Sequence, residues 1–206
     1  MKKQISFIGL MIMIIIIGNN LAIAQTKIWK TESVDGGKIV VKSCVSERQD
    51  GTTTLPLIEY VVTTSANVNY QKCLAMLKDI NKHKSFLDLK SAFQIKEISE
   101  NESIIYYCFN APWPFTPTDC VNKMTFTEDK IKKTASFNLQ CSPNSYKQTD
   151  YKRFNIYTVS YNFKDLGNGK VEITINARMS PPISVPLIMI RAGFPGIASD
   201  IVKGII

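Results

Sequence analysis

The chain has 206 residues, of which 45% are hydrophobic and 20% are charged, and its formal net charge is +8. This is the composition of a globular protein rather than of a disordered chain or a coiled coil, and the length allows one domain or at most two small ones. The sequence holds one histidine, His83. It therefore excludes metal sites built from several imidazoles and leaves His83 as the only imidazole partner for a nucleophilic serine or cysteine.

Residues 1–24 have the layout of a secretory signal peptide. Two lysines follow the first methionine, and residues 7–17 form an apolar run. The run is shorter than the roughly 20 apolar residues that a membrane-spanning helix needs, and small residues precede Gln25, where cleavage would occur. We therefore expect a mature domain, residues 25–206, that is periplasmic or secreted. An uncleaved N-terminal anchor is the alternative.

All five cysteines follow the expected cleavage site, so they would lie in a compartment where disulfide bonds persist. None forms a CxxC pair, so neither a thioredoxin-like redox site nor a zinc knuckle is indicated. The odd number leaves at least one thiol unpaired, and Cys73 is predicted to be a buried thiol on a helix. Cys108 and Cys120 lie about equally far from the connection at residues 112–117. A disulfide bond between them is a hypothesis that requires their Cα atoms to lie within about 7 Å.

Strand patterns dominate the chain from residue 38 to residue 179. The β-branched and apolar segments 38–46 and 55–64 predict a β-hairpin. From Tyr70 the apolar residues recur at helical spacing, with Ser65 or Asn67 available as the N-cap. Turn residues then separate further predicted strands, at residues 93–98, 103–110, 119–127, 130–139, 153–164 and 170–179.

The C-terminal segment, residues 187–205, is predicted to be a helix with an apolar stripe. Pro195 cannot donate a hydrogen bond within a helix, and Gly193 and Gly196 lie close to it, so a kink or break is expected there. An apolar helix needs an apolar surface to cover, and a run of antiparallel strands supplies one. We therefore predict an α+β fold in which a curved antiparallel sheet wraps around a long C-terminal helix.

Several stretches, in order along the chain, carry a recognisable pattern. Trp29 and residues 36–41 begin it, and residues 103–119 add a strand, a Pro-Trp-Pro turn and an aspartate. Residues 160–163 and 180–186 complete it before the C-terminal helix. The ordered set resembles the START domains, the lipid-transfer modules of the helix-grip fold. The resemblance spans essentially the whole mature chain.

The sequence also departs from that family. Thr118 stands where the family has the arginine of an Arg-Asp pair, so only Asp119 is carried over. Phe86 and Tyr161 stand in place of tryptophans, and the glycine usual before the final helix is absent. These departures leave the identity of a ligand open more than they affect the fold.

The resemblance implies an apolar cavity between the sheet and the C-terminal helix, which would act as its lid with a hinge near Pro195. Ordinary core packing is the alternative role for the aromatic and aliphatic residues placed there. Arg153 would need a partner inside the protein, such as a ligand carboxylate or phosphate, unless it is a solvated arginine at a strand edge. The candidate ligand-binding residues are Tyr106, Cys108, Arg153, Tyr157, Tyr161, Ile190, Phe194 and Ile197, with Trp113 at the cavity mouth.

Two functions from different classes follow. The first is a non-catalytic carrier of a lipid or other hydrophobic molecule, expected to be a monomer that needs no cofactor or metal and does not bind nucleic acid. Lysines near residue 130 could give it a transient contact with an anionic membrane surface. The second is a cofactor-free cyclase or hydrolase of the wider helix-grip group, which would need Asp119, Glu172 or Tyr157 inside the cavity as an acid or base.

Overall fold

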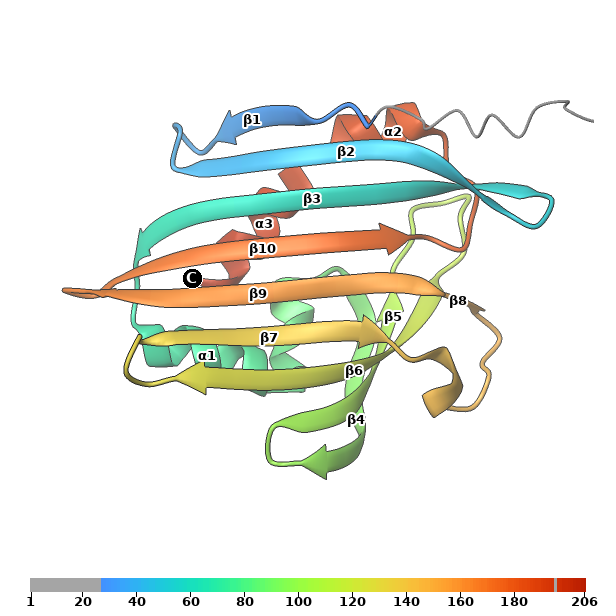
Figure 1. Ribbon diagram of the computed structural model, residues 1–206. Coiled ribbons are helices and arrows are strands. Elements are labelled where there is room, and N and C mark those ends of the chain that lie inside the picture. The colour runs from blue at the N-terminus through green and yellow to red at the C-terminus, as the bar shows by residue number, and fades with distance from the viewer. Residues whose placement is uncertain (1–26, 195) are drawn as a thin grey trace, which may run out of the picture.

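The computed structural model describes residues 27–194 and 196–206, so the predicted signal peptide lies outside the described residues. Within them ten strands form one curved sheet (Figure 1). The order is β1-β2-β3-β10-β9-β7-β6-β5-β4, all antiparallel, and β8 adds a short parallel pairing with β6. The strands are β1 (Lys30–Val34), β2 (Ile39–Asp50), β3 (Thr53–Asn67), β4 (Leu89–Ser99), β5 (Glu102–Phe109), β6 (Thr118–Asp129), β7 (Thr134–Cys141), β8 (Lys152–Arg153), β9 (Ile156–Gly167) and β10 (Lys170–Ser180).

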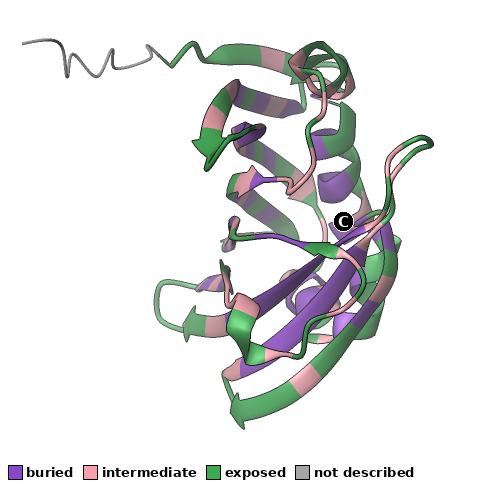
Figure 2. Ribbon diagram, turned by 90° about the vertical axis from the view of Figure 1, so that its right-hand side faces the viewer, coloured by how far each residue is buried: buried purple, intermediate pink, exposed green. Residues whose placement is uncertain are grey.

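The helices lie on the inner side of the curved sheet. α1 (Tyr70–Lys78) and the 3₁₀ helix η1 (Ile80–Ser85) follow β3, whereas α2 (Leu187–Gly193) and α3 (Gly196–Ile205) end the chain. α3 contacts both β2 and α1, and Figure 2 shows the sheet bending around the helices with buried residues between them. This is the predicted α+β helix-grip arrangement. Within the described residues, no helix is long and apolar enough to cross a membrane.

The predicted hairpin is confirmed, and it extends beyond the predicted segments. β2 pairs with β3 along its whole length, from Ile39 opposite Thr64 to Asp50 opposite Thr53. Gly51 sits in the connecting turn with a φ of 60°, a backbone conformation that favours glycine. The sequence pattern missed β1, because this short edge strand is largely exposed and has no alternating apolar residues.

The start of α1 corrects the predicted N-cap. Ser65 and Asn67 both belong to β3, and the cap is Asn69, whose side chain accepts a hydrogen bond from the backbone N–H of Lys72 at 3.0 Å. The prediction placed the cap too early because β3 continues further than its apolar pattern. Cys73 is fully buried on this helix, as predicted.

Two predicted strands begin later than expected. The strand predicted from residue 130 starts at Thr134, because Asp129 accepts hydrogen bonds from the backbone N–H groups of Ile131 and Lys132 and holds a turn there. The strand predicted from residue 153 starts at Ile156, since Arg153 belongs to the separate short strand β8.

The break predicted in the C-terminal helix is confirmed. α2 ends at Gly193, Phe194 has an extended backbone (φ −86°, ψ 135°), and α3 begins at Gly196. The two halves are held differently. None of the α2 residues is buried, whereas α3 buries five side chains, so α3 is the anchored half and α2 is the loosely packed half.

The sheet buries side chains on both faces over β5 and β6. Tyr107 and Cys120 pair across these strands and belong to the large inner core, whereas Cys108 pairs with Asp119 and points to the opposite face. The hypothesis of a Cys108–Cys120 disulfide bond is therefore wrong, because the register puts the two thiols on different faces. All five cysteines are free.

Candidate functional site: the inner face of the sheet

The inner face carries aromatic side chains that the C-terminal segment covers. Tyr60 on β3 and Tyr157 and Tyr161 on β9 are buried, each with 4% or less of its surface exposed. The ring of Phe194, at the break between α2 and α3, packs on Tyr60 with 5.3 Å between the centroids. Phe86 meets Tyr161 edge-on at 6.3 Å. The break in the helix therefore lies directly against this group of tyrosines.

Strand register explains why the tyrosines gather. Tyr157 and Tyr161 flank Val159 on β9, so all three point to the same face. Val159 pairs with Ala177 on β10, and Ala177 pairs with Tyr60 on β3. Because the side chain of Ala177 ends at Cβ, the three phenol groups are arranged around a position without a bulky side chain.

His83 is a fixed neutral member of the inner face. Its Nε2 lies 2.9 Å from the carbonyl oxygen of Leu77, and its Nδ1 contacts the hydroxyl of Tyr107. A carbonyl only accepts hydrogen bonds, so Nε2 carries the proton and Nδ1 accepts from Tyr107. Burial lowers the pKa of His83 to about 4, so the imidazole is uncharged at neutral pH.

Other polar groups on the inner face are buried without a partner. The Nδ2 of Asn122 and the Oγ of Ser199 have no hydrogen-bond partner among the described residues. The side chains of Tyr60, Tyr157 and Tyr161 on the same face are buried as well, and burial raises the pKa of each hydroxyl above its usual value. Unpaired buried polar groups are uncommon in folded proteins and call for a specific explanation.

These buried groups lie close enough to affect one another's pKa values. Burial raises the pKa of Tyr157 well above its usual value, and Tyr161, Tyr107, Cys120 and Tyr60 add to the shift. Burial also raises the pKa of Cys120, whose thiol donates to the Oδ1 of Asn122 at 3.2 Å. All of these groups are therefore neutral at physiological pH.

The structure brings some of the candidate ligand-binding residues to this face. Tyr157, Tyr161 and Phe194 are buried in the inner core, and Ile190 on α2 is partly buried against it. Ile197 was predicted to join them, but 55% of its surface is exposed. The second helix begins at Gly196, and Ile197 lies on its exposed side.

Tyr106 and Cys108 do not line the inner face, which corrects their predicted position. They lie in a separate cluster with Ile104 and Val121 on the opposite face of β5 and β6, covered in part by Tyr146. The prediction identified the strand correctly but took the alternate residues, and a shift of one residue reverses the face. Ile105 and Tyr107 are the residues of β5 that face the inner core.

Arg153 has a protein partner, which corrects the expectation that its guanidinium would need a ligand anion. Its Nε and Nη2 bind the two carboxylate oxygens of Asp119 at 3.0 and 2.8 Å. The remaining N–H groups donate, each at 2.9 Å, to the carbonyl oxygens of the loop before β8, those of Pro143, Tyr146 and Lys147. All five N–H donors are used, and the pair fastens this loop onto the outer face.

Trp113 is an exposed residue at the surface of the protein. It lies in the β5–β6 loop with 93% of its surface exposed. The lysines near residue 130 are partly neutralised, since Lys132 and Lys133 pair with Asp129 and Asp165. These pairs weaken the predicted attraction of that turn to an anionic membrane.

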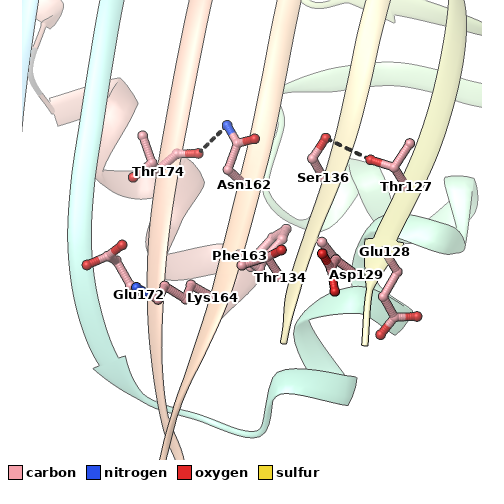
Figure 3. Close-up of a pocket in the computed structure, with 11 residues that line it drawn as sticks. Thr127, Glu128, Asp129, Thr134, Ser136, Asn162, Phe163, Lys164, Glu172 and Thr174 are labelled. Carbon is pink, nitrogen blue, oxygen red and sulfur yellow. Dashed lines mark hydrogen bonds between the residues drawn. The ribbon is translucent and has the colours of Figure 1, made fainter. Parts of the chain in front are cut away.

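The hollows of the surface differ in chemistry. One of about 450 Å³ lies on the outer side of β6, β7, β9 and β10 (Figure 3), where Thr127, Ser136, Asn162 and Thr174 form a polar row across the strands. A second, of about 670 Å³, lies between residues 27–32, β2 and α2 and includes Leu187 in its lining. The first suits an apolar ligand poorly, whereas the second opens beside the loosely packed helix. The described residues contain no group of three or more potential metal ligands.

Comparison with known proteins identifies the fold. No protein-family model matches the chain, and no curated protein matches it in sequence. A STAR-related lipid transfer protein from Xanthomonas axonopodis matches with a TM-score of 0.67 at 18% identity, over 86% of this chain and 96% of that one. The lipid transfer and protein localization domain of human StarD13 matches with 0.67 at 16% identity, over 98% and 96%. Zhui aromatase/cyclase from Streptomyces sp. R1128 matches with 0.52 at 7% identity, over 72% and 91%.

The chain therefore has a START-like helix-grip fold, as its ordered motifs predicted. The neighbours include named lipid transfer proteins and a cyclase, so the fold does not by itself choose between the two functions.

Proposed function

We propose that this protein binds and transfers a lipid or other hydrophobic small molecule beneath its C-terminal helices, without changing it chemically. The observation that carries the proposal is the inner face itself. It is apolar, it holds a few neutral polar groups, and a helical segment broken at Phe194 covers it. Pockets for hydrophobic ligands have this composition. The fold shared with named lipid transfer proteins supports the same function.

The two halves of the C-terminal segment suggest how a ligand enters. α3 is anchored by five buried residues and α2 by none, so α2 can move while α3 stays in place. Phe194 joins the halves and touches Tyr60. We infer that α2, rather than the whole C-terminal helix, is the lid.

Mass spectrometry of small molecules extracted from the purified protein tests the proposal. We expect an apolar molecule to co-purify with the wild type and to be lost in Phe194→Asp, because a charge at this covered position opposes closure over an apolar ligand. Ile197→Asp is the matched control, since that side chain is largely exposed. A folded wild-type protein that takes up no apolar probe would contradict the proposal.

Of the three residues considered as an acid or base for the enzyme alternative, only Tyr157 lies on the inner face. Asp119 forms an ion pair with Arg153 on the outer face. Glu172 is exposed on β10, opposite Lys164 of β9. Tyr157 is inside, where burial raises its pKa well above its usual value, so it is not a base at neutral pH. Recovery of an added ligand in chemically unchanged form separates the carrier from the enzyme.

We also propose that the chain is exported. The basic start, the apolar run and the small residues before Gln25 support this. N-terminal sequencing of protein from the periplasm or culture medium should begin at Gln25. Intact chain that starts at Met1 and stays in a membrane fraction would contradict export.

A further inference from the structure

The buried polar groups among the tyrosines of the inner face all lack charge. The hydroxyls of Tyr60, Tyr157 and Tyr161 and the amide of Asn122 belong to side chains that are at least nine-tenths buried. Asn122 offers an N–H donor without an acceptor. A hydroxyl both donates and accepts. Together the groups are suited to a ligand oxygen that accepts hydrogen bonds.

The inner face holds no residue able to balance a buried charge. Among the described residues, the buried side chains with a formal charge are Asp119 and Arg153, and these satisfy each other on the outer face. His83 is neutral at physiological pH and both of its nitrogens are used. Arg191, on the exposed lid helix, donates to the carbonyl oxygen of Val45 at the rim. A carboxylate or phosphate brought to the tyrosines would therefore lose its hydration without gaining a cation.

The tyrosines also lie beside the junction between α2 and α3. Tyr157, Tyr161 and Tyr60 are arranged around Ala177, and Phe194 of the lid junction rests on Tyr60. The Cys120 thiol connects this group to Asn122. An apolar body beneath the helices would thus present one polar end to the tyrosines.

Resting on the proposed function, we propose that the ligand is a neutral lipid whose polar end is a hydroxyl or carbonyl group, held by the Tyr60, Tyr157 and Tyr161 hydroxyls and the Asn122 amide. Ionised lipids such as fatty acids and phospholipids are disfavoured at this site. The preference for a neutral over an ionised lipid comes from the uncharged polar groups of the inner face. It is separate from the affinity for the apolar part of the ligand.

Three probes with the same alkyl chain test the proposal. Displacement of Nile red, a neutral apolar dye, is measured at pH 7.5 for 1-hexadecanol, hexadecanoate and hexadecane. We expect the alcohol to bind at least about tenfold more tightly than the carboxylate and more tightly than the alkane. Equal affinities for alcohol and carboxylate, or for alcohol and alkane, overturn the proposal and leave the proposed function standing. Failure of Nile red and all three probes to bind overturns both.

Tyrosine variants locate the selectivity. In Tyr157→Phe and Tyr161→Phe, the affinity for hexadecanol should fall about 3- to 10-fold while that for hexadecane is unchanged. The unliganded variants should fold as the wild type does, because phenylalanine keeps the buried ring and nearly the same volume. Tyr106→Phe, a buried tyrosine on the opposite face, is the control and should bind all probes normally. Unchanged alcohol affinity in both test variants would show that the tyrosines do not hold the ligand.

Discussion

At the scale of single residues, the inner face depends on a histidine that stays neutral. His83 donates from Nε2 to Leu77 and accepts at Nδ1 from Tyr107. Protonation of Nδ1 would turn an acceptor into a second donor and place a charge in the core. His83 therefore supports the fold only in its neutral form.

Acid should consequently destabilise the protein through His83. The folded pKa of about 4 lies below the ordinary value of 6.5, so between these values the unfolded chain binds a proton that the folded chain does not. The stabilisation is fully present above pH 6.5 and is lost as the pH falls towards 4. We expect a loss of about 3 kcal/mol in the free energy of unfolding, which urea titrations at pH 7 and pH 4.5 would largely capture.

The variant His83→Gln provides the control for this prediction. It removes the titrating group, so it should be less stable at pH 7 but should show a much smaller decrease between pH 7 and pH 4.5. An equal decrease in the variant and the wild type would assign the acid sensitivity to the carboxylates instead.

At the scale of elements, α3 is held against η1 by a close approach of backbones. A Cβ placed on Gly204 would lie 2.5 Å from the Cβ of Phe86 and 2.9 Å from its Cα. Gly204→Ala should therefore lower the free energy of unfolding by about 1–3 kcal/mol, as overpacking does. Gly196→Ala, at the start of the same helix, meets nothing within 4 Å and should be neutral or slightly stabilising. Thermal unfolding of both variants decides the matter, and similar melting temperatures would contradict the predicted close packing.

The junction between α2 and α3 should control the rate of ligand exchange if it acts as a hinge. A Cβ on Gly193 would lie 3.2 Å from the Cδ1 of Ile197, the flexible end of an exposed side chain. Gly193→Ala should therefore fold normally and stiffen the junction. We expect exchange of a bound fluorescent lipid to slow several-fold while its equilibrium affinity changes little. Unchanged exchange rates in a folded variant would rule out a hinge at this position.

At the scale of the whole molecule, the order of elements was predictable because strand and helix periodicities are local. The hairpin, the six later strands and the broken C-terminal helix all have such patterns. The face of the sheet to which a side chain points, and the residues at which each element begins and ends, were less predictable. Cys108 and Tyr106 were assigned to the wrong face because alternation alone does not say which set of residues is inside when both faces of β5 and β6 are buried.

The site was harder to predict than the fold because its contacts are distant in sequence. Arg153 and Asp119 meet through the parallel register of β8 and β6, and nothing local in the sequence indicates that pairing. Tyr60 and Asn122 were not among the candidate residues, because only the register of Tyr60 and the missing partner of the Asn122 amide distinguish them from ordinary core. An isolated asparagine among apolar residues on a predicted strand was the one available signal.

The proposed transfer of a lipid predicts that the molecule brings α2 to a membrane surface. α2 exposes Ile188 (75%) and Met189 (51%) although it covers an apolar face, and such side chains can enter the interfacial region of a membrane. Ile188→Glu should slow vesicle-to-vesicle transfer of a fluorescent lipid several-fold and leave the affinity for a soluble short-chain analogue unchanged. Ile131→Glu is the matched control, because Ile131 is equally apolar and 96% exposed but lies in the β6–β7 turn, away from α2 (Figure 1). Equal slowing in both variants would indicate a general effect of charge, and no slowing in Ile188→Glu would show that α2 does not meet the membrane.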